Sequence, residues 1–267
     1  MSKSAVGEGQ AFHDLRRADL ETASAGYARR FEGAVGAWFL ERQARAALGL
    51  LEVRASGTLR VLDVGGGHAQ LTGPLLEAGH RLTVHGSTPA CHARLAPYRS
   101  QLACVSSDLW RLPFADGCFD LVTGVRLLAH VEDWRELLAE MARVSRRFVL
   151  VDAPLTTPIH RLAPALFARK REIEGNTRPY FDYAPGEVVE GLAACGLQAV
   201  EEARQFTLPM VLHRALGWVG FSRAAEAALD ALGFTARIGS PGLFLGEKQP
   251  RVEAPAGRHE GDTRRTA

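Results

Sequence analysis

The stretch that decides the fold is Leu59-Arg-Val-Leu-Asp-Val-Gly-Gly-Gly-His-Ala-Gln-Leu71, a short apolar run followed by three consecutive glycines. Such a run is typical of a buried β-strand that turns directly into a helix. Gly65, Gly66 and Gly67 lack the Cβ atoms that would keep a ligand away from the backbone. Asp63 stands at the strand end, where its carboxylate can order the turn or meet polar groups of a ligand. The stretch predicts a ligand-binding βα turn, with a plain tight turn as the alternative.

Strand-like and helix-like segments alternate beyond this turn. The strand-like segments are 59–64, 81–85, 102–106, 119–123, 148–152, 198–206 and one that begins at Gly242. The helix-like segments between the first five are 69–79, 89–97 and 133–145. Near-continuous apolar strands separated by helices indicate a parallel sheet with both faces covered. Open sheets of this kind bind ligands at the carboxyl ends of their strands, where the glycine turn lies.

Composition limits the kind of protein. The 267 residues, of which 46% are hydrophobic and 23% charged, suit one large α/β domain with an ample core. A formal net charge of +2, from 32 basic and 30 acidic residues, argues against a nucleic-acid partner. The polar residues 1–10 and the Pro-, Gly- and charge-rich residues 249–267 are expected to be disordered tails.

The rest of the chain divides into an arm and a domain. Residues 11–54 have helical periodicity and predict an N-terminal arm of two helices, split near Gly33 and Gly36. Residues 55–248 predict the ligand-binding domain. Within it, a mostly helical cover over the ligand is expected from two segments, about 153–183 and 207–233.

Signals for membranes, secretion and metals are absent from the sequence. It has no run of about 18 apolar residues and no apolar core in Met1–Gln10, so we expect no membrane span and a cytoplasmic protein. The four cysteines lack Cys-x-x-Cys spacing and no histidine cluster completes a metal site, so no metal is expected. They are expected to be small buried apolar residues: Cys91, Cys104, Cys118 and Cys195.

Four segments in a fixed order carry a family resemblance. After the glycine turn, Val105–Phe114 contains Asp108 directly behind the third strand. Phe114-Ala-Asp-Gly-Cys-Phe-Asp-Leu-Val122 then leads into the fourth strand, and Leu127–Trp134 contains His130 before the next helix. Together they resemble the class I S-adenosylmethionine-dependent methyltransferases, and most of all the small-molecule subgroup that includes quinone-biosynthesis enzymes. The resemblance covers about 59–152.

The resemblance implies a Rossmann-like fold, with a doubly wound, mostly parallel sheet of seven strands, and S-adenosylmethionine as cofactor. It implies that the methionine part is bound by Asp63, Gly65, Gly66 and Gly67. It implies that Asp108 and Leu109 meet the adenine, and that Gly124 and Val125 line the cofactor behind the fourth strand. Upstream, Tyr27 and Arg30 of Tyr27-Ala-Arg-Arg-Phe31 are expected near the methionine carboxylate, which a guanidinium can pair.

One departure concerns the ribose. The family usually places Asp or Glu at the end of the second strand, where it holds both ribose hydroxyls. The corresponding run, Leu82-Thr-Val-His-Gly-Ser-Thr-Pro89, contains no acid. His85, Ser87 or Thr88, flanking Gly86, are the candidate substitutes. A neutral partner makes a weaker hydrogen bond, so cofactor affinity is expected to fall by about 1–2 kcal/mol unless something compensates.

The implied reaction is methyl transfer to a small-molecule acceptor, at oxygen first and then at carbon or nitrogen. His130 is the candidate base, with a structural role as its alternative, and Arg126 either binds an anionic substrate or lies on the surface. Tyr180 and Tyr183 either wall an apolar substrate pocket or pack in a loop. For His68, exposure to solvent is favoured over contact with the cofactor. The pocket is expected between the glycine turn, the region after the fourth strand and the cover.

Other functions stay open beside this one. A protein that binds the cofactor without turnover is the main alternative, because the ribose acid is missing. A nicotinamide-dependent oxidoreductase would need Gly-x-Gly-x-x-Gly and an acid after the second strand, whereas residue 70 is Gln. The sequence also leaves open whether the chain acts alone or as a homodimer.

Overall fold

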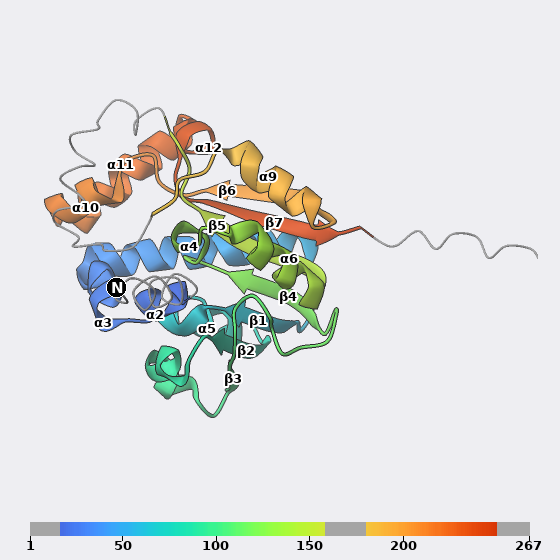
Figure 1. Ribbon diagram of the computed structural model, residues 1–267. Helices are drawn as coiled ribbons and strands as arrows, with labels where there is room; N and C mark the ends of the chain where they lie inside the picture. Colours follow the sequence, from blue (N-terminus) through green and yellow to red (C-terminus); the bar gives the residue numbers. More distant parts are fainter. Residues whose placement is uncertain (1–16, 158–179, 250–267) are drawn as a thin grey trace, which may run out of the picture.

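The computed structural model describes residues 17–157 and 180–249, which form a central sheet with helices on both faces (Figure 1). The sheet has seven strands in the order β3-β2-β1-β4-β5-β7-β6. The strands β1 to β5 are parallel to one another, and β7 lies antiparallel between β5 and β6. The bounds are β1 (Arg60–Val64), β2 (Arg81–Gly86), β3 (Leu102–Ser106), β4 (Phe119–Gly124), β5 (Ser145–Ala153), β6 (Leu197–Arg204) and β7 (Gly242–Lys248). The predicted fold class is therefore confirmed.

The helices and 3₁₀ turns of the described residues are short, apart from α4. The α-helices are α2 (Ala18–Thr22), α3 (Ala25–Ala28), α4 (Gly33–Arg54), α5 (Thr72–Glu77), α6 (Trp134–Val144), α9 (Pro185–Ala194), α10 (Met210–Leu216), α11 (Val219–Ala231) and α12 (Phe234–Ile238). The 3₁₀ turns are η1 (Arg29–Phe31), η2 (Gly66–His68), η3 (Pro89–Tyr98) and η4 (Leu128–His130).

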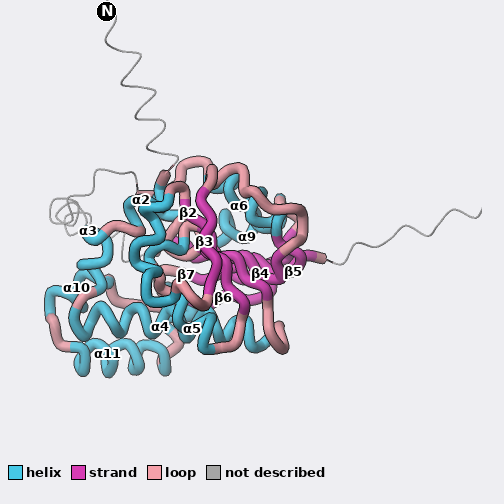
Figure 2. Tube along the Cα trace, turned by 90° about the horizontal axis from the view of Figure 1, so that it is seen from below, coloured by secondary structure: helices cyan, strands magenta, loops and turns pink. Residues whose placement is uncertain are grey.

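Alternation along the strands explains why both faces are covered. Successive strand residues point to opposite faces, so Leu62 joins one core and Val61 the other. The core that contains Leu62 is closed by α6 and α9. The core that contains Val61 is closed by α4 and α5, on the other side of the sheet (Figure 2). Because every central strand is apolar on both faces, its side chains are withdrawn from water, which is the main stabilising contribution to this fold.

The N-terminal arm differs from the prediction at its break. The break lies before Gly33, which has a φ of +72° and starts α4. Gly36 lies inside α4, where an added Cβ would stand 2.2 Å from the backbone carbon of Phe31. That glycine allows a close approach of η1 to α4 and does not end the helix. Before Gly33 the arm consists of α2, α3 and η1, and α3 is capped by Ser24 Oγ, which accepts from Tyr27 N at 3.1 Å.

Other boundaries also shifted. The helix expected over 69–79 is reduced to α5, because Ala69 adopts a φ of +63° and delays the helical turn. The segment 89–97 is a 3₁₀ helix that contains Pro97, whose ring is incompatible with α-helical hydrogen bonding. The helical segment expected within 207–233 is split at Gly217, with a φ of +64°, into α10 and α11.

Several expectations fall partly or wholly outside the described residues. These are the two tails, the start of the arm and residues 158–179 of the predicted cover. Within the described residues, no helix has the length and apolarity needed to cross a membrane, and no cluster of His, Cys, Asp and Glu could hold a metal. Cys91 is buried as expected, whereas the other three cysteines are only partly buried.

We expect Gly191→Ala to destabilise the fold. A Cβ at Gly191 of α9 would stand 2.5 Å from the buried ring of Trp134, so the ring or the helix must move. Overpacking of this kind costs about 1–3 kcal/mol of unfolding free energy, measurable by denaturant titration. The matched control is Gly186→Ala in the same helix, where nothing lies within 4 Å of the added methyl group. Equal stability of the two variants would contradict the packing described here.

Candidate functional site

The glycine turn packs closely against neighbouring parts of its own chain. Gly65 has a φ of +68°, and its N–H donates to His85 O at 2.9 Å, which ties the end of β1 to β2. An added Cβ on Gly66 would stand 2.2 Å from Asp63 Oδ2, and one on Gly67 would stand 2.2 Å from Cys91 O. The turn therefore needs glycines for its own packing as well as for any ligand.

Asp63 lies beneath this turn. Its side chain is buried, and Thr123 Oγ1 of β4 donates to Asp63 Oδ1 at 2.7 Å. Burial raises the pKa of Asp63 to about 7, and the hydrogen bond from Thr123 opposes that rise. This carboxyl group therefore ties the end of β1 to β4 and packs against Gly66 of the turn.

The end of β2 contains a buried histidine and receives a carboxylate from elsewhere. His85 Nε2 lies 2.8 Å from Ser107 Oγ, and burial lowers the pKa of His85 to about 4, so the ring is neutral. The backbone N–H of Ser87, the residue after β2, donates to Asp19 Oδ2 of α2 at 2.5 Å. Sequence reasoning missed Asp19, because no local pattern links an acid on the arm with the end of β2.

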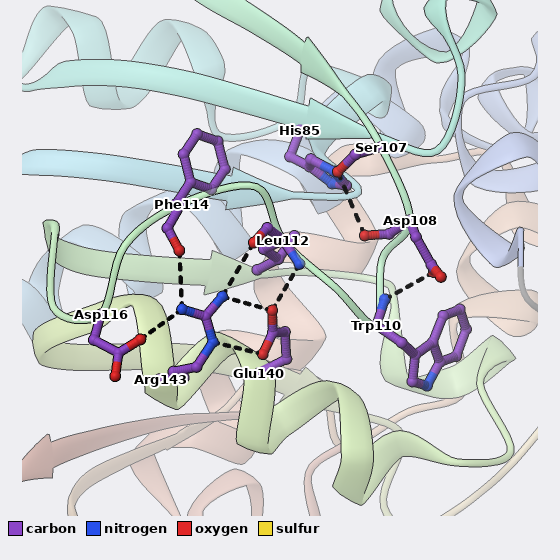
Figure 3. A network of polar contacts seen from close by, with 9 residues as sticks. All are labelled: His85, Ser107, Asp108, Trp110, Leu112, Phe114, Asp116, Glu140 and Arg143. Atoms are coloured by element: carbon purple, nitrogen blue, oxygen red, sulfur yellow. Dashed lines mark hydrogen bonds and ion pairs between the residues drawn. The ribbon is translucent and has the colours of Figure 1, made fainter.

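The loop after β3 is braced by one arginine. Arg143 Nη1 donates to Phe114 O at 2.9 Å and to Asp116 Oδ1 at 2.6 Å, while Nη2 donates to Leu112 O at 3.1 Å (Figure 3). Glu140 Oε1 accepts from Arg143 and from Leu112 N, so helix α6 fixes the part of the loop from Leu112 to Asp116. These contacts show that the segment Leu112-Pro-Phe-Ala-Asp-Gly117 has a structural role, which is to hold the loop on α6.

Asp108 opens this loop with its carboxylate at the surface. Its Oδ1 accepts from Trp110 N at 3.1 Å, which fixes the side chain over the start of the loop (Figure 3). Leu109 is fully buried in the core that α6 closes. Of the remaining predicted cofactor residues, Gly124 faces Met141, whose Cε would lie 2.8 Å from an added Cβ, and Val125 is partly buried against the α4 side.

A cavity of about 140 Å³ opens at the carboxyl ends of β4 and β5. The arm supplies one wall and the residues after β6 supply another. The lining residues from the arm and the sheet are Tyr27, Arg30, Phe31, Gln43, Arg126, Ala129, His130, Asp152, Pro154 and Thr157. Tyr180 and residues from 205–214 and 238–241 complete the lining.

A buried polar network forms the floor of this cavity. Arg126 Nε and Nη2 donate to Gln43 Oε1 at 3.1 and 3.0 Å, and Gln43 Nε2 donates to Asp152 Oδ2 at 2.8 Å. Asp152 Oδ1 accepts from the backbone N–H of Arg126, a residue with a φ of +63°. Burial lowers the pKa of Arg126 and raises that of Asp152, since each ion is withdrawn from water. Of the two alternatives for Arg126, the surface position is therefore wrong.

Aromatic rings form the wall beside this network. The Tyr27 ring lies 5.9 Å from the His130 ring and 5.4 Å from the His68 ring, centroid to centroid. His130 also meets Tyr180 at 5.8 Å. Phe31 stacks beneath the Arg126 guanidinium, 3.7 Å from its ring centroid. Tyr27 therefore contacts both the glycine turn, through His68, and the cavity, through His130.

Two sequence predictions need correction here. Tyr183 is buried in the core against Trp134, and its hydroxyl donates to Leu128 O at 2.9 Å, so it anchors its segment instead of walling the cavity. His68 does not face solvent: it is 8% exposed because the rings of Tyr27 and Phe31 pack on it. Burial lowers the pKa of His68 to about 3, and the charges of Arg126 and Arg94 lower it further.

The pocket also differs from its predicted position. The glycine turn does not contribute to the lining of the described cavity, which lies between the arm, the strand ends and the cover. Sequence reasoning missed Gln43 and Asp152. A polar residue on the buried face of α4, spaced four residues from Phe39 and from Ala47, and an acid at the end of the fifth strand were the signals available for them.

The surroundings of the glycine turn suit a polar ligand such as S-adenosylmethionine. Buried polar atoms there have no hydrogen-bond partner among the described residues, and such atoms are rare in native interiors unless a ligand or water meets them. They are Asp19 Oδ1, His68 Nδ1 and Nε2, Thr72 Oγ1, His85 Nδ1 and His92 Nε2. The glycines let a ligand approach the backbone, and these unpartnered polar atoms offer it hydrogen bonds. Both features fit a ligand with several polar groups.

Comparison with known proteins agrees with this geometry. Residues 62–148 match the family model described as "Methyltransferase domain". The chain is 36% identical over 91 residues to a malonyl-[acyl-carrier protein] O-methyltransferase of Halorhodospira halophila. The match covers 32% of this chain and 31% of that protein, so the chain spans about a third of the length of this curated relative.

Solved structures share the fold over most of the chain. The magnesium protoporphyrin IX methyltransferase of Synechocystis PCC 6803 with bound S-adenosylhomocysteine has a TM-score of 0.57 at 12% identity, covering 84% of this chain and 93% of that one. A putative methyltransferase in complex with the Trm112 activator of Haloferax volcanii has a TM-score of 0.58 at 15% identity, covering 87% and 98%. The geranyl diphosphate C-methyltransferase of Streptomyces coelicolor has a TM-score of 0.56 at 14% identity, covering 78% and 79%.

The fold is the Rossmann-like fold of these solved methyltransferases, and residues 62–148 match the family described as a methyltransferase domain. The comparisons support S-adenosylmethionine as the cofactor. They leave the quinone-biosynthesis-like subgroup as a prediction.

The buried neutral His85 predicts a pH-dependent stability difference. Its folded-state pKa of about 4 lies below the ordinary value of 6.5, so it contributes stability above pH 6.5 that is lost as the pH falls through 4. Relative to His85→Gln, which does not titrate, the wild-type chain should therefore lose stability between pH 7 and pH 4.5. Denaturant unfolding of both proteins at several pH values measures this difference, and a constant difference would show that His85 is not held neutral.

Proposed function

We propose that this protein transfers the methyl group of S-adenosylmethionine to a small-molecule acceptor, at an oxygen atom. One observation carries the proposal: the glycine turn at the end of β1 and the cavity at the ends of β4 and β5 are joined by Tyr27, whose ring contacts His68 on one side and His130 on the other. A donor on the turn and an acceptor in the cavity would meet at this ring.

The residues that would hold the cofactor come from four places. The glycine turn offers backbone close to the ligand, and Tyr27 and Arg30 line the side where a carboxylate could be paired. The Arg30 guanidinium lies 4.9 Å from the centroid of the Tyr27 ring. The end of β2 at His85, Gly86 and Ser87 is next to the turn, and Asp108 stands at the end of β3. Each of these assignments remains a proposal that binding measurements can test.

When bound, S-adenosylmethionine supplies a methyl group that its positive sulfur has already activated. The protein has to position the acceptor and exclude water, and a base is needed only if the acceptor must lose a proton. His130 is the histidine of the cavity lining and would take that proton from an acceptor hydroxyl. Arg126, with its guanidinium fixed by Gln43 over the Phe31 ring, would pair an acidic group of the acceptor.

The preference for oxygen rests on two supports. His130 beside Tyr27 gives a place to deprotonate a hydroxyl, a step that a neutral amine acceptor does not need before it attacks. The relative from Halorhodospira halophila is named an O-methyltransferase, although the match covers only part of it. Among the structural neighbours, one is a C-methyltransferase, so carbon remains the next candidate.

A cofactor-binding protein without turnover is the second candidate. The observation that favours it is the lack of an acid within β2 and the residues that follow it, from Leu82 to Pro89. Calorimetry with S-adenosylmethionine, run beside a methyl-transfer assay against hydroxylated small acids, separates the two. Binding with a methylated product supports the enzyme, whereas binding without product from any acceptor supports the second candidate.

We expect His130→Ala to lower turnover about a hundredfold with little change in cofactor affinity, because loss of a general base slows the chemical step. Turnover and calorimetry on the same preparation measure both. His80→Ala is the control, since His80 lies before β2 at the opposite end of the sheet, where its Nδ1 accepts from Leu59 N at 3.3 Å. A loss of less than about threefold in the His130 variant would leave that residue a purely structural role.

Asp108→Ala should weaken cofactor binding about tenfold, the size expected for one lost hydrogen bond to a charged group. Calorimetry with S-adenosylhomocysteine measures the effect. Asp133→Ala removes another exposed carboxylate, at the start of α6, and should change nothing. Because Asp108 also caps its own loop, thermal unfolding of the ligand-free variant checks that the loop is intact. Unchanged affinity would mean that the adenine lies elsewhere.

A further inference from the structure

We propose that Asp19 of α2 supplies the carboxylate that the end of β2 lacks, and that it binds the ribose hydroxyls of the cofactor. The inference rests on the proposed function, since it assigns one more residue to the same cofactor. It gives the N-terminal arm a second place in the cofactor site, beside Tyr27 and Arg30.

The position of the Asp19 carboxylate is the first support. Oδ2 accepts from the N–H of Ser87, the residue that follows β2. A Cβ added to Gly86, the last residue of β2, would stand 3.5 Å from the same oxygen. On the other side, a Cβ added to Gly65 would stand 3.4 Å from Asp19 Cβ. The carboxylate therefore lies between the ends of β1 and β2, within reach of the place that an acidic side chain on residue 86 would occupy.

Packing explains why the acid does not stand on β2 itself. A Cβ on Gly86 would lie 2.7 Å from Cys91 Cβ and 3.1 Å from His92 Nε2. A side chain at this position would therefore displace η3. The Asp19 carboxylate, which comes from α2, reaches the same region without displacing η3.

The state of the carboxylate is the second support. Asp19 is fully buried, and among the described residues no Arg or Lys forms an ion pair with it. Oδ2 accepts from Ser87 N and from Cys91 Sγ at 3.2 Å, whereas Oδ1 is buried with no hydrogen-bond donor. A buried carboxylate oxygen without a donor is costly, and a pair of neighbouring hydroxyls provides the donors that a carboxylate accepts best.

Helix α2 is held in place by its own contacts. Ala18 is fully buried in the core that α6 closes, and Thr22 Oγ1 donates to Asp19 O at 3.2 Å. Ala23, the residue after α2, lies against Gly67: its Cβ would be 2.9 Å from an added Cβ there. Since α2 packs this closely on the turn, a ribose that reaches Asp19 has to shift the helix, and cofactor binding should alter its protection from solvent exchange.

The test is calorimetry with S-adenosylhomocysteine on the wild-type chain, Asp19→Asn and Asp19→Ala. We expect both variants to bind at least about tenfold more weakly, because a charge-assisted hydrogen bond is lost. Glu32→Gln is the matched control: it removes an exposed carboxylate from the same arm and should bind like wild type. Thermal unfolding of the ligand-free proteins checks folding, and if the alanine variant does not fold, the asparagine variant decides.

A second probe assigns the effect to the ribose. Methylthioadenosine and its 2′-deoxy analogue differ by one hydroxyl, so wild type should prefer the first and the Asp19 variants should lose that preference. If wild type does not bind S-adenosylhomocysteine, the proposed function itself fails. If wild type binds and the Asp19 variants bind equally well or more tightly, or keep the preference, the assignment of Asp19 is overturned.

Discussion

The hydrogen bonds between Gln43, Arg126 and Asp152 are the interaction on which the cavity depends. They connect α4 of the arm to the ends of β4 and β5, in a region from which water is excluded. A buried ion is tolerated only when its partners satisfy it, and here Gln43 bridges the Arg126 guanidinium and the Asp152 carboxylate, so that both are hydrogen-bonded. This network also holds α4 against the ends of β4 and β5, beside the Tyr27 ring that faces His130 and the Phe31 ring that packs against the Arg126 guanidinium. Polar contacts elsewhere on the arm, such as Asp19 with Ser87 and Arg54 with Glu201, add to this attachment.

The fold could be predicted from the sequence because its signals are local. An apolar run such as Val61–Val64 can be read as a strand without knowledge of its partners, and the order of strands and helices then limits the topology. The helix bounds were less certain, since Gly36 reads as a break although its missing side chain serves a contact with Phe31. Local sequence does not distinguish a glycine that ends a helix from one that another segment packs against.

The site was predictable only where a motif marks it. His130 and Tyr27, which lie in segments that the family resemblance marks, are part of the cavity lining, whereas Gln43, Asp152 and Asp19 come from segments far apart in the chain. His68 shows the same limit in reverse: its neighbours in sequence are small, and the rings that bury it belong to the arm. Burial and charge pairing are properties of the assembled fold, so the prediction of solvent exposure for His68 had no basis in its local sequence.

The origin of the cavity walls has a consequence for how such a protein diversifies. Of the lining, only Arg126, Ala129 and His130 lie within residues 62–148, the segment that matches the methyltransferase domain. The remaining lining residues come from the arm, from Asp152 of β5 and from the segments after β5 and β6. The arm also packs on the glycine turn, through Ala23 and through the rings that cover His68. Exchange of the segments after β5 and β6 between relatives would therefore change the proposed acceptor cavity while the arm and the turn keep their contacts, so chimaeras joined at these segments are a practical route to altered selectivity.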